Sequence, residues 1–135
     1  MGIKVLFIYP NTYGMNMLPP AIAIFSSLLK NKGHKIQVFD TTYYAIDFGL
    51  DADGSKAVQH NELTGDGTKM DRLNIVPYDM KSKGLRLKTT NWKVDLKKQL
   101  NEFKPNLIAI SSTEDMWELG MQILKEAKDY KIKNK

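Results

Sequence analysis

The segment Lys4-Val5-Leu6-Phe7-Ile8-Tyr9 decides the fold class, because after Lys4 it is a continuous apolar run that ends at Pro10. A short run rich in Val, Ile and aromatic residues is typical of a strand buried on both faces, as in a parallel sheet. A second run, Ile36-Gln37-Val38-Phe39, ends at Asp40 and predicts another strand. The two predicted strands lie at the beginning and the end of the first third of the chain.

Between these strands the sequence predicts one helix. Pro20 suits the first helical position, where the missing N–H is harmless, and Gly33 suits the left-handed residue just past the last turn. Strand, helix and strand together predict a right-handed parallel crossover. The apolar residues expected on the buried helix face are Ala21, Ile22, Ile24, Phe25, Leu28 and Leu29.

The middle of the chain has a different character. Residues 45–90 are polar and contain two Asp-Gly pairs, so we interpret them as an irregular insertion with a possible short strand at Leu73 to Tyr78. Regular structure returns with a helix that ends at Pro105. The apolar residues that share one face of this helix are Trp92, Leu96, Leu100 and Phe103.

A third strand is predicted at 106–111, followed by a last helix. Ser111 with Glu114, or Ser112 with Asp115, has the spacing of a capping box that opens a helix. Trp117 is expected to pack in a core or an interface, as is Trp92, because each stands at helical spacing with apolar residues. The predicted inner stripe of the last helix is Met116, Gly120, Ile123, Leu124 and Ala127.

These elements predict a single, partial α/β domain over residues 1–135 with a flavodoxin-like or Rossmann-like three-layer fold. If the third strand lies on the far side of the first, the incomplete parallel sheet has the order 2-1-3. In such a sheet ligands bind between the carboxyl ends of the first and third strands, where the winding reverses. Two loops, 10–19 and 111–115, are therefore expected to line a crevice.

Composition limits the function classes. The chain has no cysteine, which excludes disulfides, thiolate zinc sites and any iron–sulfur cluster held by its own residues. No apolar run is long enough to span a bilayer, and we expect a cytoplasmic protein that binds neither membrane nor nucleic acid. The net charge of +5 is mild, and its densest lysines, on the last helix and tail, are interpreted as a solvated helix face.

The loop after the first strand argues against nucleotides. It lacks the Gly-x-Gly-x-x-Gly pattern that lets backbone approach a pyrophosphate, and it lacks a Gly-Lys-Ser/Thr phosphate loop. Its bulky residues suit a large, partly apolar ligand, although Met17 and Leu18 could equally pack onto the following helix. Asp40 is interpreted as a polar strand terminus. The bulky loop residues are Tyr13, Met15, Met17, Leu18 and Pro19.

Two stretches of the chain resemble a known family. The first runs from Lys4 to Asp40 and includes Tyr9-Pro10, Tyr13-Gly14, Leu18-Pro19-Pro20, Gly33-His34 and Phe39-Asp40; the second is 104–113. Together they cover about a third of the chain and resemble the N-terminal cobalamin-binding domain of cobalamin-dependent radical SAM enzymes.

The resemblance implies a cofactor and a site. Cobalamin would lie over the carboxyl ends of the strands, with hydroxyls after the third strand offered to the displaced nucleotide tail. The residues that the resemblance assigns to cofactor binding are Pro10, Asn11, Thr12, Tyr13, Gly14, Met17, Leu18, Ser111, Ser112, Thr113 and Glu114. It assigns none to catalysis and none to a metal.

The chain also departs from cobalamin-binding proteins. The Asp-x-His-x-x-Gly motif that supplies a cobalt ligand in cobalamin mutases is missing, because the loop has no histidine; His34 follows the first helix and His60 lies in the insertion. Cobalamin is therefore expected to bind base-off without a protein imidazole. S-adenosylmethionine and a [4Fe–4S] cluster would belong to a radical SAM domain absent from this chain.

The partners expected from the sequence follow from the predicted third strand. The chain reads as truncated before a fourth strand, which leaves an unpaired apolar edge. We expect this edge to pair with the missing radical SAM part or with a second copy. The alternative function is a flavodoxin-like protein-interaction domain without a cofactor.

Overall fold

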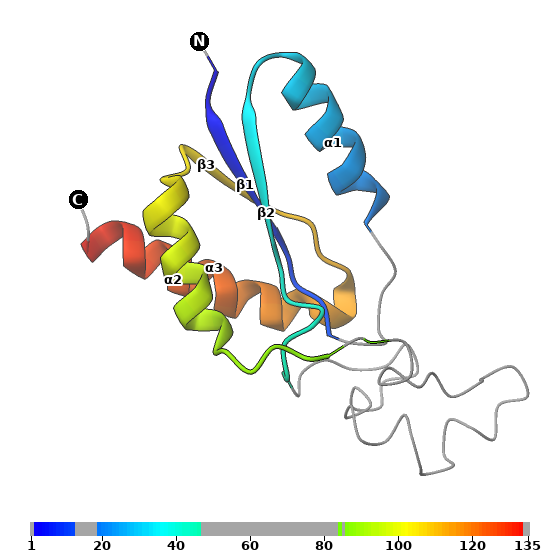
Figure 1. Cartoon of the computed structure of the whole chain (residues 1–135), viewed down its shortest axis with the longest axis vertical. Helices are drawn as coiled ribbons and strands as arrows, with labels where there is room; N and C mark the ends of the chain where they lie inside the picture. The colour runs from blue at the N-terminus through cyan, green and yellow to red at the C-terminus, as the bar shows by residue number, and fades with distance from the viewer. Residues whose placement is uncertain (1, 13–18, 47–83, 85, 134–135) are drawn as a thin grey trace, which may run out of the picture.

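The apolar run at the start of the chain forms the central strand of the fold. The computed structural model describes residues 2–12, 19–46, 84 and 86–133. In it β1 (Lys4–Tyr9) lies between β2 (Lys35–Asp40) and β3 (Leu107–Ile110) in a parallel sheet of order β2-β1-β3 (Figure 1). Every residue of β1 after the first is buried. The predicted α/β class and the 2-1-3 order are confirmed.

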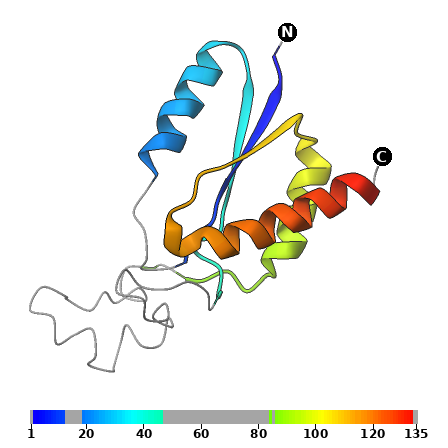
Figure 2. The same cartoon turned by 180° about the vertical axis from the view of Figure 1, so that it is seen from behind.

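Helices cover both faces of the sheet. Figures 1 and 2 show α1 (Pro20–Asn31) on one side, and α2 (Trp92–Phe103) with α3 (Trp117–Lys133) on the other. Because side chains alternate along a strand, β1 supplies both cores. One core joins Val5, Phe7 and Tyr9 to α1. The other contains Leu6, Ile8, Leu96, Leu100, Phe103, Met116, Leu119, Ile123 and Ala127.

Both ends of α1 are set by the residues that the sequence singles out. Pro20 occupies the first turn, and Gly33 stands just past the helix with φ +80°. The Gly33 N–H donates to Lys30 O at 2.9 Å and the His34 N–H donates to Leu29 O at 3.0 Å. This pair of bonds is a Schellman motif, which satisfies the last carbonyls of the helix and requires the left-handed backbone that glycine adopts without strain.

The buried face of α1 is narrower than predicted. Ile22 is buried, but Ile24, Phe25 and Leu28 are 58%, 53% and 55% exposed. The helix rests on the sheet through positions 22, 26 and 29, and at 100° per residue Phe25 and Leu28 lie on its flank. In the described part of the chain no second helix lies beside α1 on this face, so nothing covers that flank.

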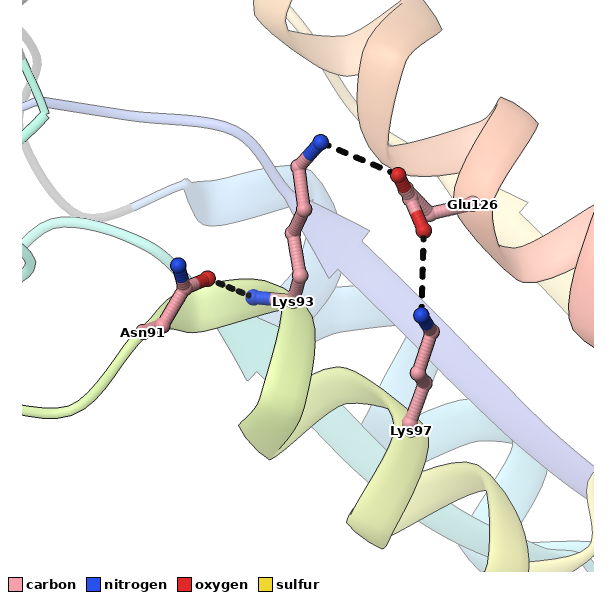
Figure 3. Close-up of polar contacts among 4 residues, drawn as sticks. All are labelled: Asn91, Lys93, Lys97 and Glu126. Carbon is pink, nitrogen blue, oxygen red and sulfur yellow. Dashed lines mark hydrogen bonds and ion pairs between the residues drawn. The ribbon is translucent and has the colours of Figure 1, made fainter.

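Asn91 opens α2, its side chain accepting a hydrogen bond from the Lys93 N–H at 2.9 Å. The helix ends before Pro105 as predicted, with Lys104 left-handed at φ 49°. Across the gap to α3, Glu126 pairs with Lys93 at 3.0 Å and with Lys97 at 3.6 Å (Figure 3). This fork holds together the outer flanks of the two helices.

The start of the last helix differs from the prediction. A 3-10 turn, η2 (Glu114–Met116), precedes α3, and its cap residue Thr113 makes no side-chain capping bond. The cap residue is therefore neither Ser111 nor Ser112, and the Ser112 hydroxyl donates to Thr113 O at 2.9 Å; the side chain of Asp115, the partner in the second predicted box, lies outside the described residues. Trp117 does not pack in the core, because its side chain is 57% exposed, so packing in an interface stays a prediction; Trp92 is half-buried against the core.

The insertion leaves and rejoins the fold at one place. Tyr44 forms a parallel bridge with Lys88, and the Lys88 N–H donates to Tyr43 O at 2.7 Å. Most of the predicted insertion, including the possible strand at Leu73 to Tyr78, lies outside the described residues. None of the described helices has the length and apolarity that crossing a membrane demands.

Candidate functional site

The segments that follow β1 and β3 meet at the carboxyl edge of the sheet. The Ser111 N–H donates to Ile8 O at 3.1 Å, which ties the start of the second segment to the end of β1. Gly120 of α3 lies beneath both segments. A Cβ placed on it would stand 2.7 Å from Ile110 Cδ1, 3.2 Å from Pro10 Cγ and 3.6 Å from Ser112 Oγ. The absence of a side chain at Gly120 therefore lets the two segments converge at the predicted crevice.

A buried polar network positions the backbone at the end of β1. The Asn11 N–H donates to the Thr41 hydroxyl at 2.9 Å, and that hydroxyl donates to Asn11 O at 2.8 Å. Asn11 is 1% exposed and Thr41 is fully buried. Thr41 thus satisfies both backbone groups of Asn11 in a place from which water is excluded.

The network continues to the end of β2. The Asn11 side-chain amide donates to the Thr42 hydroxyl at 3.0 Å, and that hydroxyl donates to Asp40 at 2.5 Å. Asp40 also accepts from the Thr42 N–H at 2.8 Å, which is an Asx turn. Its interpretation as a polar strand terminus is confirmed. The polar Asp40-Thr41-Thr42 sequence at the end of β2 is the signal from which this hydrogen-bond network could have been predicted.

Thr12 is the last described residue before the loop and has an unusual environment. Its side chain is 5% exposed, and within the described segments its hydroxyl has no hydrogen-bond partner. A buried hydroxyl without a partner is costly, so it marks a position able to receive a polar group of a ligand.

Seven of the residues predicted for the site lie at this edge. Pro10, Asn11 and Thr12 are buried, Ser111 and Ser112 are half-buried, and Thr113 and Glu114 are exposed. The buried residues therefore shape the floor, while the segment after β3 presents its hydroxyls and Glu114 nearer to solvent. The other four predicted residues, Tyr13, Gly14, Met17 and Leu18, lie outside the described residues.

A second polar cluster lies where the insertion rejoins the fold. Asp95 accepts from the Thr90 hydroxyl at 2.6 Å and from the Tyr44 hydroxyl at 2.7 Å, and these bonds lower its pKa. Burial and the bond to Asp95 raise the pKa of Tyr44. Lys88 donates to the Tyr44 hydroxyl at 3.3 Å and stands 4.3 Å from the centre of its ring. Sequence reasoning missed this cluster, which fastens α2 to the end of β2.

No histidine stands at the crevice among the described residues. His34 lies at the opposite end of the sheet, where its Nδ1 accepts from the Ile3 N–H at 3.1 Å, and His60 is outside the described residues. In the described segments no three His, Cys, Asp or Glu side chains gather in a way that could hold a metal ion.

Comparisons with protein-family models, with curated proteins and with solved structures found no match to this chain.

Proposed function

We propose that this domain binds cobalamin at the carboxyl ends of β1 and β3, base-off and without a histidine ligand, as the corrinoid module of a radical SAM methyltransferase or cyclase. The cobalamin would supply the cobalt that carries the transferred group. S-adenosylmethionine and a [4Fe–4S] cluster would be held by another domain, because this chain has no cysteine to ligate the cluster.

The observation that carries the proposal is the convergence of two unlike segments over Gly120. A switch point in a 2-1-3 sheet is where such folds bind their ligands. Pro10 and Ser112 both stand close to Gly120, so the half-buried Ser112 lies beside a tightly packed floor to which Pro10 belongs. The lack of a phosphate-binding glycine pattern disfavours a nucleotide at the same place.

Three features of the described residues fit a corrinoid. The buried Thr12 hydroxyl has no partner within the described segments and can bond a ligand amide. Ser111 is a half-buried hydroxyl suited to the nitrogen of a displaced benzimidazole, and the half-buried Ser112 hydroxyl, which donates to Thr113 O, can accept from a ligand amide. Asn11, anchored by Thr41, holds the backbone that leads into the loop.

A visible-absorption titration of the apo chain with hydroxocobalamin, followed by gel filtration, tests the proposal. We expect the corrinoid to elute with the protein and to show the base-off spectrum. The variants S112A and T12V should each weaken binding about tenfold, the value of one buried hydrogen bond to a ligand. Tyr13→Ala probes the loop in the same assay.

The matched control is S27A on the exposed side of α1, which removes the same hydroxyl far from the crevice and should bind like the wild type. Corrinoid that fails to elute with a correctly folded wild-type chain contradicts the proposal. Binding with a base-on spectrum would contradict the base-off mode alone. Equal losses in S112A and S27A would place any binding elsewhere.

One observation favours the alternative, a protein-interaction domain without a cofactor. Ile24, Phe25 and Leu28 form an exposed apolar flank on α1, and exposed apolar patches commonly mark interaction surfaces. The titration separates the two functions. A folded, colourless chain that binds no corrinoid would support the alternative.

A further inference from the structure

The two edges of the sheet are built differently. Along β2 the Gln99 side chain donates to Val38 O at 3.3 Å and to the Gln37 side chain at 2.9 Å, so α2 occupies part of that edge. Lys35 places a positive charge on β2, and such a charge on an edge strand also discourages pairing with another strand. By contrast β3 reads Leu-Ile-Ala-Ile, without a charge, and among the described residues no strand lies beyond it.

The hydrogen-bond pattern shows which groups of β3 face the open edge. Leu6 lies opposite Ile108 and Ile8 opposite Ile110, and the Ser111 N–H donates to Ile8 O at 3.1 Å, so the odd-numbered residues of β3 point their backbone groups toward β1. Neighbouring residues of a strand point their backbone groups in opposite directions. The N–H and C=O groups of Ile108 and Ile110 therefore point outward, and the Leu107 side chain at the start of the strand is 49% exposed.

An apolar flank of α3 lies on the same side. Glu126 faces α2 through its pairs with Lys93 and Lys97. At 100° per residue, Trp117 and Met121 lie on the opposite flank of α3, away from α2. They are 57% and 44% exposed. The open edge thus combines unpaired backbone groups with exposed apolar side chains.

We propose that β3 pairs with β3 of a second copy of this chain about a two-fold axis normal to the sheet, which joins the two sheets into one. Such an axis keeps the helix-covered faces of the two sheets on matching sides. Residues that stand opposite each other must then point their side chains to the same face, so their numbers are both odd or both even. With Ala109 on the axis, Ile108 stands opposite Ile110 of the other copy. These are the residues whose backbone groups point outward, so each copy can donate to and accept from the other.

The charges near β3 are compatible with a second copy as the partner, although each copy carries a net charge of +5. The strand itself has no charged side chain, and both flanking residues Trp117 and Met121 are uncharged. In the proposed register the exposed Lys104 of one copy approaches the segment after β3 of the other, where the exposed Glu114 lies. Opposite charges would then meet at both ends of the paired strands.

Sedimentation velocity of the apo chain over a hundredfold range of concentration tests this interface and does not depend on any cofactor. We expect a reversible dimer. Ile108→Pro removes an outward N–H, a change that an edge strand tolerates, and should raise the dimer dissociation constant about tenfold or more relative to Ile108→Ala. Met121→Lys places a charge on the flank and should also weaken the dimer, whereas Val94→Lys, at a 63% exposed position on α2, should not.

Circular dichroism establishes whether each variant is folded, and Met121→Lys still tests the interface if Ile108→Pro is unfolded. A wild-type chain that stays monomeric at every concentration overturns the proposal. A dimer that resists both Ile108→Pro and Met121→Lys also overturns it. If Phe25→Lys alone dissociates the dimer, the copies associate through α1, and the proposed β3 pairing is wrong.

Discussion

Replacing Thr41 by Val tests how the site at the end of β1 is held. The two side chains have nearly the same shape, so the substitution removes a hydroxyl without opening a cavity. That hydroxyl accepts from the Asn11 N–H at 2.9 Å and donates to Asn11 O at 2.8 Å. Since Thr41 is fully buried and Asn11 is 1% exposed, water cannot replace either bond.

The expected loss follows from those two backbone groups. A buried donor or acceptor left without a partner costs about 1–3 kcal/mol, so losing both bonds should lower the free energy of unfolding by about 2–4 kcal/mol. For a chain of 135 residues this corresponds to a fall in Tm of about 6–15 °C. The backbone of Asn11 also leads into the loop, so corrinoid binding should weaken with it if the proposed function holds.

Urea unfolding followed by circular dichroism measures the change, with a constant m value as the sign that the unfolded state is unaffected. Thr41→Ser keeps the hydroxyl and should recover much of the stability. Thr89→Val makes the same chemical change at an exposed position and should have little effect. A change below about 0.5 kcal/mol in Thr41→Val, the scatter of ordinary surface substitutions, would refute the reasoning.

Three further outcomes are expected from unfolding experiments. Leu100→Ala should cost about 2–5 kcal/mol because Leu100 is 2% exposed, whereas Leu28→Ala at a 55% exposed position should cost far less; equal losses would show that α1 is covered. Gly33→Ala should cost about 1–2 kcal/mol, since φ is +80°, with Asn tolerated better than Ala; no loss would contradict the Schellman motif. Asp95 has a lowered pKa in the folded state, so its contribution is present above the pKa of about 4 of an unfolded Asp and is lost as pH falls through the folded value. Below about pH 4 the urea concentration at the midpoint of unfolding should therefore fall less steeply with decreasing pH in Asp95→Asn than in the wild type. Parallel curves for the two proteins would contradict a stabilising contribution of ionised Asp95.

Local sequence signals predicted the elements and their order. The apolar run of β1, Pro20 at the start of α1 and Gly33 past its end each act within a few residues of their own position, so their effect can be read without knowing the rest of the fold. The preference for right-handed crossovers then leaves few sheet orders to consider. The location of the candidate site at the carboxyl ends of β1 and β3 followed from that order.

Burial on the helices depended on what lies beside them. A periodic stripe shows that a helix is amphipathic, but Phe25 and Trp117 are exposed because, within the described residues, no neighbouring element covers their flanks. The sequence has the same apolar residues whether or not such a neighbour exists. Only the packed structure distinguishes the two cases.

The sequence by itself determined the α/β class and the succession of strands and helices, because these follow from local pattern, and chain handedness left the 2-1-3 sheet that the structure has as one of few orders. The tertiary structure alone decided how that edge is held. The bonds between Asn11 and Thr41, and the approach of Gly120 to Pro10, join residues far apart in the chain. Their geometry depends on the register of β1 against β2 and on the seating of α3, neither of which any local sequence pattern encodes.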